Sequence, residues 1–412
     1  LSTGSYDLFS YADAAKFVTQ RSYLSTDKKE QKAGSKFLKE FKSIKTDNQK
    51  ELIRAMEDHI KSNYAFVDYN SPQLEEMSSI LDQKMANSYG YIKLFTTALE
   101  EYNIPHEIVL TTNRMNQRFD PDFESYSFLD KFLLYFPEEE LFLSPHDPAL
   151  RLGFVPPEHT ANHGFFIERV NLGDIYTGIG QVKYIPFLPA DKTLRGLDIT
   201  INLEDDIYSS KGKLKNVIDG YYARGIQYYY NQVPPEKKEE FLSSVVERYT
   251  DRGELDDLIA KNTDVNDFGK KPLVIEADFQ VEPFIEKIGN KYLLKVGELI
   301  GPQMEMYHDL KERTQDVESI HTRTYHRVIR LNIPDGLKIT NPNDVRMDYQ
   351  YNNGEETLMA FISDYSMEGN TMVIEIKEFY NRIIFPVEVF EEYKKVINAA
   401  ADFNKIGLIL EQ

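Results

Sequence analysis

The chain has 412 residues, more than one ordinary hydrophobic core needs, so we expect two or three domains. Its 41% hydrophobic and 28% charged residues are typical of a globular protein, and its net charge of −19 disfavours nucleic acids and anionic membranes as partners. The absence of cysteine excludes disulfides, thiolate metal sites and thiol nucleophiles. No apolar run approaches the roughly 20 residues that span a bilayer.

The N-terminal part of the chain predicts helices followed by strands. A short helix is expected from Ala12, and apolar residues at helical spacing predict a longer one from Asn48, with Asp47 or Asn48 as its N-cap. Two further helices are expected over residues 74–85 and 88–102, and the second of these ends at Pro105. A buried strand over 104–110 and a hairpin formed by 128–136 and 141–143 follow. Because the helices precede the strands, the order favours an α+β fold.

The remainder of the chain predicts mainly strands, with residues 213–260 expected to be helical. Glycine, proline and asparagine turns separate the short apolar stretches, and the polar segment 308–321 is a plausible linker. The evenly spaced strands beyond it are typical of a C-terminal antiparallel sandwich. The expected strands cover residues 164–167, 181–185, 197–203, 273–281, 291–299, 325–333, 358–362, 372–376 and 382–387, before a helix over 388–403 and a strand over 406–410.

The stretch from Asn87 to Leu110 carries a family resemblance. It is similar to the nucleophile helix and following strand of the transglutaminase-like, papain-type superfamily. In that family the helix dipole stabilises a cysteine thiolate at the helix N-terminus, a histidine on the next strand shuttles the proton, and an aspartate or asparagine orients the histidine. The resemblance places Ser88 at the cysteine position, Asp130 at the histidine position and Ser144 at the aspartate position.

The resemblance also implies a domain organisation. Bacterial multi-domain proteins typical of the Bacteroides group carry such a core with β-rich domains of unknown function around it. We therefore expect four segments: 1–45 as a linker or helical remnant of a missing N-terminal domain, 46–160 as a degenerate transglutaminase-like core, 161–315 as a mixed β-rich domain with a helical insertion, and 316–412 as the β-sandwich. Proteins of this kind are usually exported, so the resemblance implies a periplasmic or cell-surface location. The start at Leu1, without Met or a leader, leads us to expect a processed protein or a fragment.

Substitution of all three catalytic positions predicts a pseudoenzyme. We expect a recognition or scaffold protein that binds a peptide or glycan and uses no cofactor. The alternative is an acyl hydrolase based on Ser88, but a serine hydroxyl needs a nearby base. Asp130 is a poor one, because an exposed carboxylate has a pKa of about 4.

A second alternative is a metal-dependent hydrolase. The metal-capable residues His146, Asp147, His159 and His163 lie close together in the sequence. Pro156-Pro157 and Gly164 leave little room for a helix that would bring His159 and His163 to one side, so exposed loop histidines are the competing interpretation.

Overall fold

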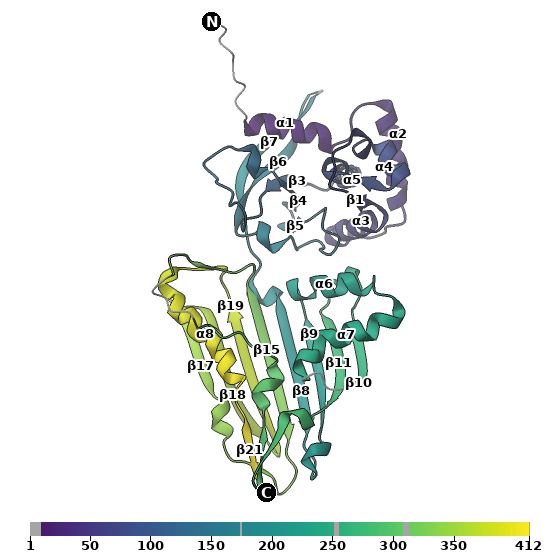
Figure 1. Ribbon diagram of the computed structural model, residues 1–412. Helices are drawn as coiled ribbons and strands as arrows, with labels where there is room; N and C mark the ends of the chain where they lie inside the picture. Colours follow the sequence, from purple (N-terminus) through teal and green to yellow (C-terminus); the bar gives the residue numbers. More distant parts are fainter. Residues whose placement is uncertain (1–9, 174, 251–254, 308–312, 412) are drawn as a thin grey trace. The chain divides into compact units, whose positions relative to one another are not determined.

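The computed structural model describes residues 10–173, 175–250, 255–307 and 313–411, and the chain forms two compact units, 1–187 and 188–412 (Figure 1). The boundaries expected after residues 45, 160 and 315 differ from this division. Residues 162–172 and 175–185 extend the sheet of the first unit, and residues 324–332 pair with 194–202 in the second. A sheet is closed by pairing between distant segments, which local composition does not reveal.

The helices of the first unit form around a central one. They are α1 (Tyr11–Ser22), α2 (Lys28–Phe37), α3 (Gln49–Asn63), α4 (Met77–Gln83) and α5 (Ser88–Glu101). Asn48, one of the two N-cap candidates in the sequence, caps α3 by accepting from the Glu51 N–H. Every residue of α5 from Gly90 to Leu99 is buried, so α5 is surrounded by protein and not amphipathic at a surface.

An antiparallel sheet of order β5-β4-β3-β6-β7 completes the first unit, alongside a short parallel pair of β1 (Ala65–Phe66) with β2 (Met85–Ala86). Its strands are β3 (Glu107–Thr111), β4 (Lys131–Phe136), β5 (Leu141–Leu143), β6 (Asn162–Leu172) and β7 (Ile175–Ile185). The predicted hairpin of β4 and β5 is confirmed. Because strand side chains alternate, Ile108 and Leu110 pack in the main core with α5, while Val109 packs on the other face with Leu133 and Phe166.

The second unit is built on an eight-stranded sheet of order β10-β11-β9-β8-β15-β19-β18-β17. Its strands are β8 (Leu194–Asn202), β9 (Lys211–Ile218), β10 (Leu255–Lys261), β11 (Leu273–Gln280), β15 (Arg323–Asn332), β17 (Met347–Asn353), β18 (Glu356–Glu368) and β19 (Thr371–Tyr380). All its pairs are antiparallel except β8 with β15. The expected separate sandwich over 316–412 is therefore wrong, because its strands continue a sheet begun at residue 194.

Helices and smaller sheets accompany this long sheet. The helices are α6 (Tyr221–Tyr230), α7 (Lys238–Val246) and α8 (Phe390–Phe403), and Figure 1 shows α7 and α8 over the same face. A four-stranded sheet has the order β12-β13-β21-β16 with β12 (Ile285–Ile288), β13 (Lys291–Leu294), β21 (Leu408–Glu411) and β16 (Lys338–Ile339). A pair joins β14 (Val317–Glu318) to β20 (Ile384–Phe385), and the start of the predicted linker, 308–312, lies outside the described residues.

The prediction of helix over 213–260 is wrong at both ends. Residues 211–218 form β9 and 255–261 form β10. In β9 the buried side chains alternate with exposed ones such as Lys213 and Lys215, which is the period of a strand. Similarly, β13 ends at Leu294, and residues 296–300 form a 3-10 turn.

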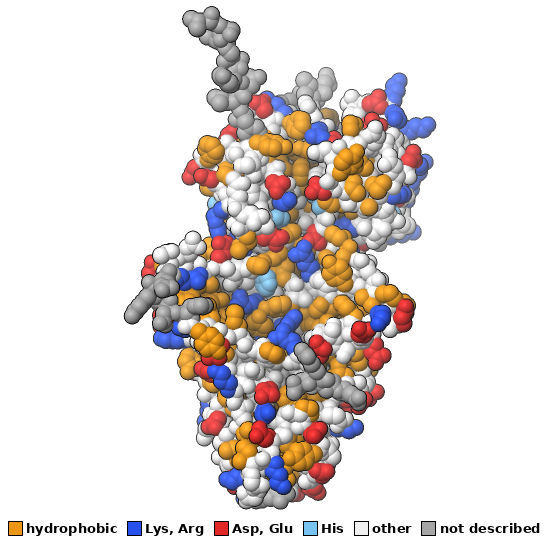
Figure 2. Space-filling model, in the orientation of Figure 1, with side chains coloured by type: hydrophobic (Ala, Val, Ile, Leu, Met, Phe, Trp, Pro, Cys, Tyr) orange, Lys and Arg blue, Asp and Glu red, His pale blue; other side chains and the backbone are white. Residues whose placement is uncertain are grey.

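The long sheet has one buried and one charged face. Cross-strand ion pairs lie on the charged face, for example Lys213 with Asp278 at 3.0 Å and Lys261 with Glu276 at 2.8 Å. On the face of the molecule in Figure 2, acidic and basic side chains both appear over each unit. Among the described residues, no helix has the length and apolar character that a bilayer crossing requires.

Candidate functional site

The N-terminus of α5 is held by close backbone packing. Asn87 is its N-cap and accepts from the Gly90 N–H at 3.1 Å, so Ser88 is the first helical residue and not the cap. Gly90 lies against the main chain of Leu74, where a Cβ atom would come within 1.9 Å of the carbonyl oxygen. The absence of a side chain at residue 90 therefore allows this contact.

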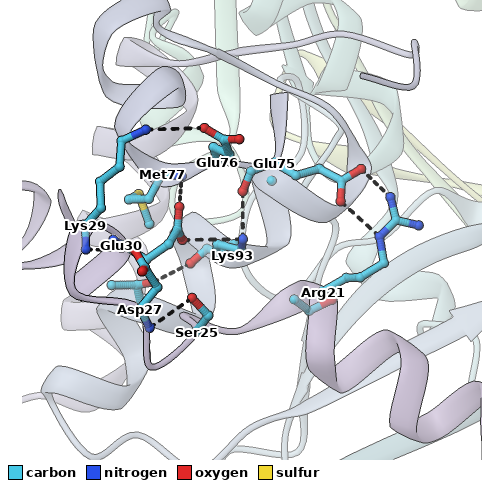
Figure 3. Close-up of polar contacts among 12 residues, drawn as sticks. Arg21, Ser25, Asp27, Lys29, Glu30, Glu75, Glu76, Met77 and Lys93 are labelled. Atoms are coloured by element: carbon cyan, nitrogen blue, oxygen red, sulfur yellow. Dashed lines mark hydrogen bonds and ion pairs between the residues drawn. The ribbon is translucent and has the colours of Figure 1, made fainter. Parts of the chain in front are cut away.

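A polar network centred on Glu75 fixes the same helix end (Figure 3). Arg21 donates two hydrogen bonds to the Glu75 carboxylate, one of them at 2.9 Å from Nε, and Asn87 Nδ2 donates a third at 2.9 Å. Lys93 Nζ donates to the Glu75 carbonyl at 2.6 Å. Burial opposes the charge of Glu75, but its bonds to Arg21 and Asn87 prevail and its pKa is lowered. The network thus stabilises a carboxylate that holds the cap residue in place.

Lys93 extends this network to two more helices. Its side chain is buried, and Nζ lies 3.6 Å from Glu30 Oε2. The other oxygen of Glu30 accepts from the Met77 N–H at 2.8 Å, at the start of α4. As Figure 3 shows, Glu30 on α2 is therefore the common partner of α4 and α5.

The loop after β5 is anchored to α3 by buried charges. Lys61 and Glu57 pair at 2.7 Å with side chains 1% and 0% exposed. Lys61 also donates to the Leu150 carbonyl at 2.8 Å, and Glu57 accepts from the Leu152 N–H at 2.7 Å. Arg151 pairs with Asp58 at 2.6 Å. These contacts fix the loop that carries Ser144 and His146.

The segments around the three family positions meet at the N-terminus of α5. Tyr89, next to Ser88, contacts Phe132, two residues after Asp130, with ring centres 5.3 Å apart. Phe132 in turn contacts His146, two residues after Ser144, at 5.9 Å. The structure therefore brings together the three segments that the resemblance selected.

The three side chains themselves do not form a hydrogen-bonded set among the described residues. Asp130 is exposed and pairs with Lys131 at 3.1 Å, while Ser144 is buried. The carbonyl oxygen of Ser88 lies 3.4 Å from His146 Nε2. Because a carbonyl only accepts, Nε2 carries the proton in this bond.

His146 is an imidazole that the family alignment passed over. Its ring stacks on Phe66 with centres 4.3 Å apart and meets the edge of Tyr91 at 5.9 Å. Burial lowers its pKa to about 4, so the ring is neutral at pH 7. The sequence signal that could have found it is its position two residues after Ser144. The sequence analysis considered His146 only as a possible metal ligand.

The metal-capable residues do not assemble. His159 is buried, with Nδ1 3.1 Å from the Thr112 carbonyl, and burial lowers its pKa. The ring of His163 lies against Tyr184 at 5.4 Å. Within the described ranges, no three His, Asp or Glu side chains, including His146 and Asp147, form a group that could hold a metal ion. His159 is also not an exposed loop histidine, contrary to the competing interpretation.

Aromatic side chains border the N-terminus of α5. Phe17 is 50% exposed and contacts Tyr89 with ring centres 6.1 Å apart. The Arg21 guanidinium lies over the Tyr89 ring at 3.8 Å. Tyr126 is 72% exposed. Burial raises the pKa of Tyr89, and the negative charge that Tyr126 carries when ionised raises it further. We call Phe17, Tyr89 and Tyr126 the aromatic rim.

Comparison with known proteins finds a likeness among solved structures and none among family models or curated proteins. No protein-family model matches the chain, and no curated protein matches it. The fold is similar to the crystal structure of a putative protease from Parabacteroides distasonis ATCC 8503, with a TM-score of 0.51 and 10% identity over 97% of this chain. The chain spans 58% of the length of that structure. At this identity the likeness shows a shared mixed helix-and-strand fold.

Proposed function

We propose that this protein is a non-catalytic member of the transglutaminase-like, papain-type superfamily that acts by binding. The observation that carries the proposal is the state of His146. This ring contacts the Ser88 segment, yet it is neutral, stacked on Phe66 and donates its Nε2 proton to a main-chain carbonyl. A nitrogen that donates to a carbonyl does not take the proton of a serine hydroxyl.

The other family positions offer no substitute base. The exposed carboxylate of Asp130 pairs with Lys131, and Ser144 brings only another hydroxyl. Activation of Ser88 would need a base within hydrogen-bond reach and with a pKa near the working pH. Loss of these groups supports a binding role over acyl transfer.

The aromatic rim supports a peptide or glycan as the ligand. Aromatic faces pack against sugar rings and apolar peptide side chains, and their stiffness keeps the entropic cost of binding low. Phe17 and Tyr126 expose such faces beside the former catalytic helix. We also propose, from the family resemblance, membership of the multi-domain Bacteroides-type proteins and a periplasmic or cell-surface location, which fractionation of the source cells would test.

Labelling with a fluorophosphonate probe tests the absence of catalysis. We expect no labelling above that of heat-denatured protein. The matched control compares Ser88→Ala with Ser71→Ala, a serine of similar partial exposure in the same unit. Labelling that Ser88→Ala abolishes and Ser71→Ala leaves intact would overturn the proposal.

Arrays of peptides and glycans test the binding role. We expect retained ligands to be lost in Phe17→Ala and Tyr126→Ala, but kept in Tyr69→Ala, which removes an aromatic ring that is 66% exposed in the same unit. Equal retention by all three variants would remove the aromatic rim from the proposal.

The competing proposal is a hydrolase based on Ser88, favoured by the protease name of the structural neighbour. It requires His146 to release the Ser88 carbonyl and turn toward the hydroxyl. A hydrolase that uses His146, His159 and His163 to hold a metal finds no supporting geometry among the described residues.

A further inference from the structure

The buried face of the eight-stranded sheet changes character along β15. Ile329 and Leu331 point to the core and are fully buried. The same face continues through Arg327, Tyr325 and Arg323, because side chains two residues apart share a face. On this face of β15, two arginines and a tyrosine therefore occupy the positions next to Ile329, where apolar core residues would be expected.

Neighbouring strands add to this polar layer. Arg195 on β8 stands beside Tyr325 in the parallel pair, and Glu378 on β19 stands opposite Tyr325 in the antiparallel pair. The residues enclose a cavity of about 190 Å³ within the second unit. Its charged lining consists of four arginines and one glutamate: Arg195, Arg248, Arg323, Arg327 and Glu378. Figure 2 shows basic side chains among hydrophobic ones on one face of this unit.

The single carboxylate of the lining is already used. Arg327 donates to Glu378 at 2.9 Å, and both residues are 4% exposed. Tyr380 donates to the second oxygen of Glu378 at 3.1 Å. Glu378 therefore neutralises one arginine and leaves three without an acidic partner in the cavity lining.

The other three arginines of the lining donate hydrogen bonds to uncharged oxygen atoms or have a donor without a hydrogen bond among the described residues. Arg248 donates to the Pro302 carbonyl at 3.2 Å, and Arg323 donates to Ser319 Oγ at 3.4 Å. The Nε atom of Arg195 is buried without a hydrogen-bond partner among the described residues. An unsatisfied donor on a charged group is costly, and no hydrogen bond among the described residues offsets this cost.

Tyrosine rings hold the guanidinium planes in place. Arg195 lies over Tyr222 at 4.8 Å, Arg323 over Tyr380 at 4.0 Å, and Arg327 over Tyr325 at 4.8 Å. Tyr222 and Tyr325 share a short hydrogen bond between their hydroxyls. Stacking occupies the flat faces of the guanidinium groups and leaves their N–H edges to bind a ligand.

We propose that this cavity binds a small oxyanion, a carboxylate or phosphate group on a ligand no larger than a single ring. Planar N–H edges match the oxygens of both groups, and the volume is near that of cavities that hold one benzene, at about 150 Å³. The arginines concentrate positive charge in a chain of net charge −19, against the trend of the whole molecule. The site lies in the second unit and is independent of the binding role proposed for the first.

Isothermal titration of the full chain tests the site. The probes are inorganic phosphate, sulfate, acetate and glucuronate at constant ionic strength, and the arms separate phosphate from carboxylate chemistry. We expect at least one probe to bind, and Arg195→Gln to weaken it tenfold or more because a charge-assisted bond is lost. The matched control is Arg330→Gln on the same sheet, which removes the exposed pair with Asp198 on the opposite face and should leave the affinity unchanged.

Thermal unfolding separates a binding role from a structural one. Because Arg195 Nε makes no hydrogen bond to the described residues, Arg195→Gln should unfold close to the wild-type temperature, while losing the stabilisation that the anion gives. If this variant does not fold, Arg323→Gln takes its place. Absence of binding for all four probes, or equal losses in Arg195→Gln and Arg330→Gln, would overturn the proposal.

Discussion

Replacement of Lys61 by methionine tests whether the buried pair with Glu57 anchors the loop after β5. The 2.7 Å pair is almost fully buried, and its attraction at an effective dielectric constant of about 20 is of the order of 6 kcal/mol, largely offset by desolvation. Lys61→Met leaves the Glu57 carboxylate buried with the Leu152 N–H as its remaining partner described here. We expect the first unit to lose about 3–5 kcal/mol of unfolding free energy.

The double variant Lys61→Met with Glu57→Gln isolates the charge. A glutamine oxygen still accepts from the Leu152 N–H while the unpaired charge is gone, so the double variant should be more stable than Lys61→Met alone. Lys16→Met, which removes an exposed pair with Asp13 at 3.3 Å, is the control and should change the stability far less than Lys61→Met. Urea unfolding followed by far-UV circular dichroism suits a chain without tryptophan. A loss below 1 kcal/mol in Lys61→Met, or no recovery in the double variant, would refute the reasoning.

Three more predictions concern the N-terminus of α5 and its surroundings. Because burial depresses the pKa of His146 from 6.5 to about 4, the unfolded state binds the proton more readily, and stability should fall by about 3 kcal/mol as the pH drops from 6.5 to 4. His146→Gln should flatten this part of a urea-unfolding series against pH, and an unchanged slope would contradict the assignment. Gly90→Ala should cost at least about 2 kcal/mol by thermal or urea unfolding, since its Cβ would overlap the Leu74 carbonyl. Gly225→Ala in α6, with its nearest neighbour atom at 3.9 Å, should be neutral or stabilising. Asn87→Ala should cost about 1 kcal/mol through loss of the helix cap, and an effect within error would assign the cap to other contacts.

Local sequence patterns correctly predicted several helices and a hairpin, whose formation depends on residues close together in the chain. The cap at Asn48, the helix that begins at Ser88 and the hairpin of β4 and β5 follow from side-chain periodicity and turn residues. The expected helix over 213–260 was wrong at its start, because the exposed lysines of β9 alternate with buried residues as they do in a half-exposed strand. The sequence therefore constrains single elements better than it constrains their neighbours in a sheet.

The sequence predicted only part of the candidate site, because local patterns identify single segments and not the long-range contacts between them. The segments of Ser88, Asp130 and Ser144 were expected to meet, and Tyr89, Phe132 and His146 do pack together. The bond from His146 to the Ser88 carbonyl spans 58 residues and depends on a loop anchored by α3, which no local pattern reports. The arginine cavity was missed because Arg195, Arg323 and Arg327 lie on two strands whose parallel pairing is non-local.

The parallel pairing of β8 with β15 has a consequence for how the chain is made. Every residue from Leu194 to Asn202 has its partner between Thr324 and Asn332. When β8 to β11 have left the ribosome, they can form four strands of the sheet. The β8 edge of these four strands stays unpaired until β15 has been synthesised. An open edge is a template for pairing with another nascent chain, so we expect the chain to be prone to aggregation until β15 has been synthesised.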